Sequence, residues 1–499
     1  MARPGTATRP PLIDRARELH DLDRAWKSAG PELLIATGRR RAGKSFLVAR
    51  YLEGRRGFYY QATRATSREQ LGAIYEAALA ALPKAGLAYG AGFRDWDAFF
   101  RFIAHQAGDR AFLLVLDELP YLLDAVRGFG TILQKHWDHT FPRTKVKLVL
   151  TGSYVSAMRR LTTADQPLHG RRTGRLAFEP FDYLDAARFF PGYDPADRLR
   201  AWAIFGGLPG QLVLLDPRAP LHENVARHIL DPAGRLADEA EHLFDAFLQE
   251  AGVHYSIVRA IAQGEHKWSK ITNRVGKQSA SLSRPLQWLL DMDVLERILP
   301  VTEPADGNPK RAVYRLTDPY LSFWHRFVAR LRAGGAVGLV RPADLWRRHV
   351  APGLDDYMGR WFERACRTFV GAAAHPRLPF RPDRVGEWWS EDAQEEVDVV
   401  ALGGRGEVLL GECKWGHAVA ADLEQLERRR DALVRELGSV RRVHLAIFAG
   451  RPITDRRLRQ RLAASDALHF SLDDLFASGP VRSSAAPRRR GTHAAPRAG

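Results

Sequence analysis

Short apolar runs alternate with helix-like stretches along the first third of the chain. The runs are Leu33–Ala36, Gly57–Gln61, Phe112–Leu116 and Val146–Leu150, with a fifth at Leu176–Phe178. Short apolar runs separated by helices are typical of a parallel sheet that is covered on both faces. The pattern therefore predicts an α/β fold for about residues 12–175.

A second zone, about residues 180–330, has a mostly helical pattern. Its last part predicts three short helices, at Ser256–Gln263, Trp268–Val275 and Ser283–Leu290. Two strand-like runs follow, Leu295–Val301 and Ala312–Leu316, joined by the loop Pro304–Lys310. Three helices and a hairpin in this order indicate a winged helix.

A third zone, about residues 345–477, returns to an α/β pattern. It opens with a helix at Leu354–Val370. Strands are expected at Val385–Trp389, Glu396–Leu402, Glu407–Lys414 and Val443–Ala449, with a helix at Asp422–Leu437 before the last of them. The whole chain is thus expected to be an α/β protein with a helical part between two sheets.

The bulk composition is that of an ordinary globular protein, with 45% hydrophobic and 27% charged residues. Two cysteines are too few for a disulfide framework or a multi-cysteine zinc site. No apolar run approaches the ~20 residues that span a bilayer, and the N-terminus lacks the apolar core of a signal peptide. We therefore expect a cytoplasmic protein without a membrane segment.

The net charge of +17 favours an anionic partner such as nucleic acid. Seven of the arginines behind it lie in the terminal segments, five in 478–499 and two in 1–10, which leaves +10 for the body of the protein. Residues 1–11 and 478–499 are rich in Pro, Ala and Arg, and we expect both to be disordered. A general bias toward arginine is the alternative explanation of the charge.

A phosphate-binding motif joins the first apolar run to the helix that follows it, Phe46–Leu52. The chain matches G-x-x-x-x-G-K-[ST] without a gap at Gly38, Arg39, Arg40, Arg41, Ala42, Gly43, Lys44 and Ser45. Glycines let backbone N–H groups surround the phosphates, and Lys44 adds a positive charge toward the β and γ phosphates. The Ser45 hydroxyl is suited to ligate Mg²⁺. The motif predicts that the chain binds ATP with Mg²⁺.

A partner motif stands at the end of the third apolar run, Phe112–Leu116, where Asp117 and Glu118 follow directly. An apolar strand that ends in two acids is typical of a Walker B motif. We expect Asp117 to hold Mg²⁺ through water and Glu118 to polarise the attacking water as a general base. The alternative is an ordinary helix N-cap after a core strand.

Two further polar clusters are candidates for the same site. Thr151, Gly152 and Ser153 follow a predicted strand, and polar groups at such ends face the ligand crevice of open α/β sheets. Ser153 or Thr151 is expected to sense the γ-phosphate or to orient water, with simple turn residues as the alternative. Arg171 and Arg172 are candidates to neutralise transition-state charge, within one chain or from a neighbouring subunit of a homo-oligomer. A solvated basic loop is the alternative there.

These motifs resemble those of the archaeal-type AAA-related P-loop ATPases, in the branch with an additional strand and a catalytic glutamate. The resemblance rests on the phosphate loop, on Leu116–Leu123, on the Thr-Gly-Ser strand end and on Pro167–Thr173. It extends to Ile204–Pro209, which looks like the turn in that family's helical lid, and to Tyr314–Trp324, which resembles its segment after the winged helix.

The resemblance also implies a division into domains. Residues 12–178 would be the P-loop ATPase core, 179–245 the helical lid, 246–330 the winged helix and 345–477 a restriction-endonuclease-like domain. The last of these carries the least specific motifs.

The third zone contains a second constellation of charged residues. Asp398 lies in one expected strand, and Glu412 and Lys414 share a face of the next. This resembles the PD-(D/E)xK pattern of nucleases, in which two carboxylates share a divalent cation and the lysine assists the attacking water. We expect Asp398 and Glu412 to hold a second Mg²⁺ or Mn²⁺. An ion pair at a strand edge of an inactive domain is the alternative.

Nucleases of this pattern often add a glutamate from the preceding helix. Glu363 has that place, just past the edge of the apolar arc of Leu354–Val370. A surface acid would usually sit further round the helix, although a surface salt bridge remains the alternative for Glu363.

Basic residues surround the expected recognition helix of the winged helix, and they suit contacts with DNA phosphates. They are Lys267, Lys270, Arg274, Lys277 and Arg284. Pro285 is compatible with that helix only if the helix starts near Ser283. Winged helices also bind proteins, so DNA is one of two partners that the pattern allows.

The leading hypothesis is an ATPase coupled to a winged helix and to a metal-dependent nuclease-like domain that acts on DNA. The first alternative is a nucleotide switch, in which ATP binding moves the lid and the winged helix and presents a surface to a partner, with little turnover. The second alternative is a C-terminal domain that binds without catalysis.

Overall fold

The computed structural model describes residues 12–82, 92–152, 158, 161, 163, 166–243, 252–304, 307, 309–372 and 375–477. Ser153 and the two terminal segments expected to be disordered lie outside these ranges. The chain forms two compact units, Met1–Pro180 with Leu208–Gly210, and Phe181–Gly207 with Gln211–Gly499. The first unit contains one sheet and the second contains two.

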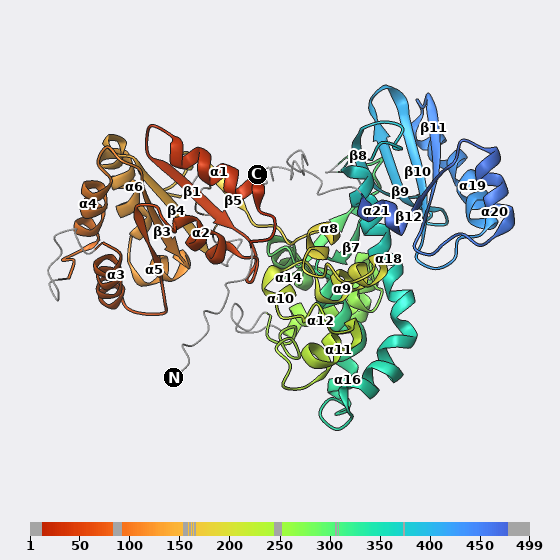
Figure 1. The fold of residues 1–499 in the computed structure, drawn as a ribbon, viewed down its shortest axis with the longest axis horizontal. Coiled ribbons are helices and arrows are strands. Elements are labelled where there is room, and N and C mark those ends of the chain that lie inside the picture. The colour runs from red at the N-terminus through yellow and green to blue at the C-terminus, as the bar shows by residue number, and fades with distance from the viewer. Residues whose placement is uncertain are drawn as a thin grey trace. The chain divides into compact units, whose positions relative to one another are not determined.

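The first unit is built on a five-stranded parallel sheet in the order β2-β3-β4-β1-β5 (Figure 1). The strands are β1 (Glu32–Thr37), β2 (Gly57–Gln61), β3 (Phe112–Asp117), β4 (Val146–Gly152) and β5 (Gly174–Ala177). They coincide with the five apolar runs, which confirms the predicted α/β fold. Because all five strands are parallel, the end of β1, the end of β3 and the end of β4 lie at one edge of the sheet.

Helices cover both faces of this sheet. One face packs against α3 (Ser67–Ala81), α4 (Trp96–Ala107), α5 (Leu119–Ala125) and α6 (Phe129–His139). The other face packs against α1 (Ala16–Lys27) and α2 (Lys44–Leu52). Leu114 of β3 belongs to the first core and Val115 to the second. Burial on both faces explains why the strands are continuous apolar runs.

The second unit begins with helices, as the sequence predicts. They are α8 (Tyr183–Ala187), α9 (Pro195–Phe205) and α11 (Leu221–Val225), and a π-helical turn follows at Ala226–Leu230. The short α10 (Pro209–Leu212) begins in the first unit and ends in the second. Next come α12 (Gly252–Ala262), α13 (Trp268–Val275), α14 (Ser279–Asp291) and the antiparallel strands β6 (Leu295–Ile298) and β7 (Val313–Leu316). This is the element order expected for a winged helix.

The expectation that the third of these helices starts near Ser283 was wrong. Helix α14 begins at Ser279, and Pro285 lies inside it. A proline at this position removes the N–H that would pair with the carbonyl group of Ser281. Ser281 is exposed, so water can satisfy that carbonyl, and the helix continues.

The segment after the hairpin consists mainly of helices. It contains α15 (Pro319–Phe323), α16 (Ala329–Ala333), α17 (Pro342–Leu345) and the long α18 (Ala351–Gly371), with π-helical turns at Trp324–Val328 and Trp346–Val350. In the described part of the chain no helix is both long and apolar enough to cross a membrane.

The C-terminal sheet has five strands in the order β12-β11-β10-β9-β8 (Figure 1). They are β8 (Pro382–Trp389), β9 (Glu396–Gly403), β10 (Glu407–Lys414), β11 (Arg442–Ala449) and β12 (Leu468–Ser471). Strand β9 is antiparallel to both of its neighbours, β8 and β10, whereas β10, β11 and β12 are parallel to one another, so the sheet is mixed.

Helices also cover both faces of the C-terminal sheet. Helix α18 packs on one face, and α19 (Ala420–Leu437) and α20 (Arg456–Ala464) pack on the other. The sequence predicted all of these elements except α20, β12 and α21 (Leu472–Ala477).

Candidate active site

The phosphate-binding motif forms the turn between β1 and α2, as the sequence predicts. Arg41 and Gly43 both have a left-handed backbone, with φ of 66° and 88°. Gly38 is needed for a different reason, because a Cβ atom there would lie 2.6 Å from the carbonyl oxygen of Phe178. The first glycine of the motif therefore serves close packing, and the second serves the backbone conformation.

Lys44 lies inside this loop with only 4% of its surface exposed. Its Nζ atom donates to the carbonyl groups of Gly38 (2.8 Å) and Arg39 (2.9 Å). Burial lowers the pKa of Lys44 to about 8, although the nearby carboxylates of Glu118 and Asp117 raise it. The ammonium group holds neutral carbonyls, so a nucleotide phosphate would be a stronger partner for it.

Asp117 ends β3 and is completely buried. Its Oδ1 atom accepts from the backbone N–H of Glu118 (2.9 Å), and its Oδ2 atom accepts from Oγ of Ser45 (2.6 Å) and from the hydroxyl of Tyr59. The structure thus brings together Ser45 and Asp117, the two residues expected at Mg²⁺. A hydroxyl and a carboxylate are the oxygen donors that Mg²⁺ prefers, so this pair fits the ion.

Tyr59 was not predicted as a site residue. It lies on β2, and only the strand order places β2 beside β3. Nothing in the sequence pattern indicates that pairing. The hydroxyl of Tyr59 restrains the same carboxylate oxygen that contacts Ser45.

Glu118 follows Asp117 with a left-handed backbone, φ 50° and ψ 45°, at the start of α5. For a residue other than glycine this conformation costs on the order of 1–3 kcal/mol and persists only where the surroundings impose it. Its carboxylate is close enough to Lys44 to raise the pKa of that lysine. The strained turn therefore keeps Glu118 at the same sheet edge as the phosphate loop.

Thr151 lies near the end of β4, beside Ala36 of β1. It is completely buried, and its hydroxyl has no hydrogen-bond partner among the described residues. A buried hydroxyl in this state costs about 1–3 kcal/mol, which a water or ligand at this edge would recover. Ser153 lies outside the described residues. The role expected for Thr151 or Ser153 stays a prediction.

Arg171 is held within the first unit. Its Nε and Nη2 atoms both lie 2.7 Å from the carboxylate oxygens of Asp138, and Nη1 donates to the carbonyl groups of Pro167 and His169. Arg172 is exposed. The prediction that one of these arginines neutralises transition-state charge fits Arg172 better, because the guanidinium of Arg171 is already paired.

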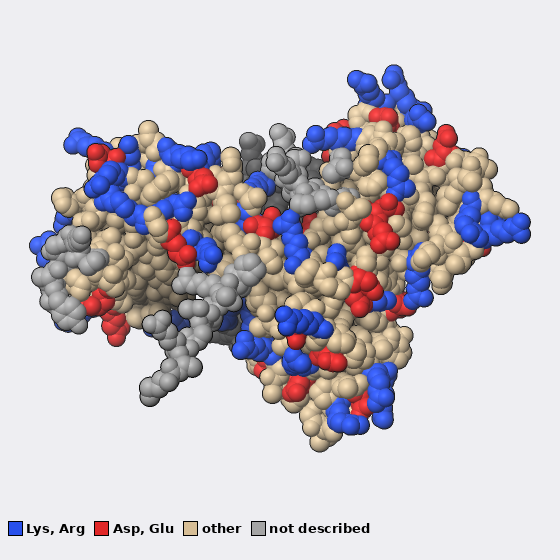
Figure 2. Space-filling view, in the orientation of Figure 1, with Lys and Arg blue, Asp and Glu red and all other residues tan. Residues whose placement is uncertain are grey.

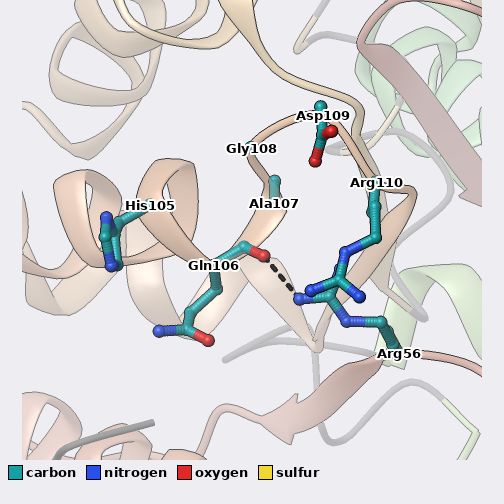
Figure 3. Close-up of a pocket in the computed structure, with 7 residues that line it drawn as sticks. All are labelled: Arg56, His105, Gln106, Ala107, Gly108, Asp109 and Arg110. Atoms are coloured by element: carbon teal, nitrogen blue, oxygen red, sulfur yellow. Dashed lines mark hydrogen bonds between the residues drawn. The ribbon is translucent and has the colours of Figure 1, made fainter.

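A small polar pocket of about 310 Å³ lies at the opposite edge of this sheet, at the end of α4 (Figure 3). There Nη2 of Arg56 donates to the carbonyl group of Gln106 (2.9 Å). Cations near a helix C-terminus satisfy its last carbonyls. The pocket is therefore explained as a helix cap, and it lies away from the phosphate loop.

The second predicted constellation lies in the second unit, on β9 and β10. Glu412 is 3% exposed and lies between two cations, since its Oε1 atom accepts from Nζ of Lys414 (2.8 Å) and its Oε2 atom from Nη1 of Arg429 (2.8 Å). Oδ2 of Asp398 accepts from the backbone N–H of Cys413 (2.8 Å). Asp398, Glu412 and Lys414 thus lie together on neighbouring strands. Arg429, on α19, was not predicted.

Glu363, on α18, is a neighbour of Asp398. Burial raises the pKa of Asp398 well above its usual range, and the carboxylates of Glu363 and Glu412 raise it further. Burial also raises the pKa of Glu363, against the effect of Arg367, which lies 3.7 Å from it. The mutual effect of these acids on their pKa values places Asp398, Glu363 and Glu412 near one another.

A divalent cation in this second cluster stays a prediction. In the described ranges no group of three or more His, Cys, Asp or Glu side chains is arranged to hold a metal ion. Both carboxylate oxygens of Glu412 already have cationic partners. Glu387, another acid that was not predicted, is 2% exposed and pairs with Arg315 of β7 at 2.7 Å.

Residues 12–215 match the model of a family described as an ATPase domain predominantly from Archaea. The match includes the loop Gly38–Ser45 and the pair Asp117 and Glu118. This chain contains an archaeal-type ATPase domain. Such a domain binds ATP and Mg²⁺ in general. Residues 324–427 match a second family, described as archaeal and bacterial proteins of unknown function.

Similar proteins come from several archaea. An uncharacterised protein of Methanocaldococcus jannaschii is 25% identical over 420 residues, 84% of this chain and 90% of the relative. A Walker-type ATPase of Pyrococcus abyssi is 21% identical, with 63% of this chain and 96% of that chain covered and a TM-score of 0.49. The ORC2 protein of Aeropyrum pernix is 14% identical, with coverages of 66% and 98% and a TM-score of 0.40.

Replacing Tyr59 by phenylalanine removes only the hydroxyl that restrains Asp117. We expect the affinity of the ATPase domain for ATP in the presence of Mg²⁺ to fall about fivefold, since one hydrogen bond is worth about 1 kcal/mol. The affinity measured with EDTA should change little. Calorimetric titration under both conditions measures the difference.

Tyr60→Phe is a matched control for this variant, because Tyr60 lies on the same strand and its hydroxyl bonds to Gln70 instead. Equal losses with Mg²⁺ and with EDTA, or the same loss in Tyr60→Phe, would contradict the role of Tyr59.

The pKa of Lys44 predicts a pH dependence of ATP binding. The free protein carries the Lys44 charge below about pH 8 and loses it above. A bound phosphate raises the pKa again, so binding near or above pH 8 takes up a proton. We expect the affinity for ATP to fall between about pH 7 and about pH 9. Calorimetry in buffers of different ionisation enthalpy should show the proton uptake.

Lys44→Met should weaken ATP binding, and the binding that remains at high ATP concentration should take up no proton, whereas Lys27→Met, at an exposed lysine of α1, should preserve both the binding and the uptake. Proton uptake that persists in Lys44→Met would assign the titration to another group.

Proposed function

We propose that this protein hydrolyses ATP with Mg²⁺ at the edge of its parallel sheet. The contact between Ser45 and Asp117 is the observation that supports the proposal most directly, because it joins the phosphate loop to the strand end that carries Glu118. Mg²⁺, when bound, would neutralise charge on the phosphates. Ser45 and Asp117 would hold it, Lys44 would bind the β and γ phosphates, and Glu118 would polarise the attacking water.

The remaining predicted residues have supporting roles in this proposal. Thr151 or Ser153 would orient the water or contact the γ-phosphate. Arg172, supplied from a neighbouring copy in a homo-oligomer, would neutralise charge as the γ-phosphate leaves.

DNA is the proposed partner of the second unit. Lys267, Lys270, Arg274, Lys277 and Arg284 are all exposed, on or beside α13 and α14. Exposed basic side chains around such helices suit phosphate contacts. On the face drawn in Figure 2, however, basic and acidic side chains are interspersed, so the charge distribution alone does not mark one binding surface.

The test of the ATPase proposal is steady-state ATP turnover, measured with and without DNA. We expect Glu118→Gln to bind ATP normally and to lower kcat at least about 100-fold, because a general base contributes that much. Lys44→Ala should lose binding instead. If the wild-type protein turns over no ATP under either condition but binds a partner according to its nucleotide state, the protein is a nucleotide switch and not an ATP hydrolase.

A second candidate function is metal-dependent cleavage of a phosphodiester in the C-terminal part. It is favoured by one observation, the crowding of the Asp398 carboxylate with those of Glu363 and Glu412 beside Lys414. A divalent cation would relieve the repulsion among these acids. At Glu412 it would compete with Lys414 and Arg429, which already pair with that carboxylate.

A Mn²⁺ titration of the full chain with saturating ADP and Mg²⁺ at the nucleotide site tests this candidate. We expect a second binding event that Asp398→Asn removes, and Mn²⁺-dependent DNA cleavage that Lys414→Ala removes. Asp392→Asn, in the exposed turn before β9, is the control and should retain both. If Mn²⁺ binds but no DNA substrate is cleaved, the C-terminal domain is a domain that binds without catalysis. If Mn²⁺ does not bind, the cluster is not a metal site.

A further inference from the structure

Arg15 reaches the phosphate loop from outside the motif. It is the N-cap residue of α1, with a left-handed backbone at φ 70°, and it is only 6% exposed. A buried arginine is uncommon, and so is this backbone conformation in a residue other than glycine. Both features persist only where contacts stabilise them.

The contacts of Arg15 account for its position. Nη1 pairs with Oε1 of Glu18 at 3.1 Å, and the guanidinium lies 5.3 Å from the ring centre of Phe178. Nη2 donates to the carbonyl oxygen of Ala42, in the phosphate loop, at 2.9 Å. The ion pair and the aromatic ring thus hold the guanidinium against one peptide group of the loop.

Phe178 ties this arrangement to the start of the loop. Its backbone N–H donates to the carbonyl group of Thr37 (2.7 Å), the last residue of β1. Gly38 packs so closely on Phe178 that no side chain fits there. Arg15 therefore contacts the loop at Ala42 and stacks on the residue that packs against its first glycine.

Four carbonyl groups of the loop accept hydrogen bonds from nearby residues. Those of Gly38 and Arg39 accept from Lys44, and that of Arg41 accepts from the backbone N–H of Gly210 at 3.0 Å. The carbonyl group of Ala42 is held by Arg15. Two of these four restraints, from Gly210 and Arg15, come from residues outside the motif.

The geometry of a peptide group shows why the restraint at Ala42 matters. In a planar trans peptide the carbonyl group and the following N–H point in opposite directions. A carbonyl of Ala42 that is held by Arg15 therefore turns the N–H of Gly43 to the other side of the loop. That N–H belongs to the set that the motif uses to bind phosphate.

We propose that Arg15 is a positioning residue for the nucleotide phosphates, because it fixes the peptide between Ala42 and Gly43 before the nucleotide binds. The inference rests on the proposed ATP binding. A preformed loop lowers the cost of ordering on binding. Since the loop holds the β-phosphate in the ground state and in the transition state alike, loss of Arg15 raises KM and leaves kcat nearly unchanged.

The experiment compares Arg15→Gln, Arg15→Lys and the control Arg17→Gln in the full chain. Arg17 is exposed, two residues away, and has the same side chain. We expect calorimetric titration with ADP and Mg²⁺ to show about tenfold weaker binding for Arg15→Gln, because the peptide between Ala42 and Gly43 must then be ordered when the nucleotide binds. Arg15→Lys should recover part of the affinity, and Arg17→Gln should match the wild type.

A folding defect has a different signature from a loss of positioning. Partial unfolding lowers the number of ADP sites and kcat together, whereas the proposed role raises Kd and KM while the number of sites and kcat stay the same. An Arg15→Gln protein with wild-type affinity, or with fewer sites of unchanged affinity, overturns the inference alone. A wild-type protein that binds no ADP overturns the proposed function as well.

Discussion

The insertion of β4 between β1 and β3 is the constraint on which the nucleotide site depends. All three strands are parallel, so their C-terminal ends meet at one edge of the sheet. The phosphate loop starts at the end of β1, Asp117 is the last residue of β3, and Thr151 lies near the end of β4. The parallel strands therefore bring the three ends to one edge even though they lie far apart in the sequence.

The same constraint explains what the sequence could and could not predict. Ser45, Asp117 and Glu118 could be placed at this edge from the motifs alone, because their positions follow from one strand or one turn. Tyr59 could not be found, because its contact with Asp117 arises from the pairing of β2 with β3, which no local pattern encodes. Arg15 was not predicted either, because its contact with Ala42 joins two segments that lie 27 residues apart in the chain.

Predictions from local sequence were wrong or incomplete where solvent or another element of the fold contacts the residues concerned. The helix containing Pro285 was expected to start later, because a proline normally ends the pattern, yet the carbonyl that loses its partner is exposed to water. In the C-terminal part, the sequence correctly placed Asp398 and Glu412 on neighbouring strands. It gave no sign of Arg429 on α19 or Arg315 on β7, which pair with Glu412 and Glu387 on other elements of the fold.

The two clusters differ in what it costs to bind a charged ligand. In the second unit two of the buried acids already have cationic partners, since Glu412 pairs with Lys414 and Arg429 and Glu387 pairs with Arg315. A divalent cation bound to Glu412 would compete with these ion pairs for the same carboxylate. At the phosphate loop the described hydrogen-bond partners of Lys44 are two neutral carbonyl groups. A nucleotide phosphate is attracted to that ammonium group, and its binding breaks no ion pair of Lys44. The charges around Lys44 therefore favour the binding of a nucleotide.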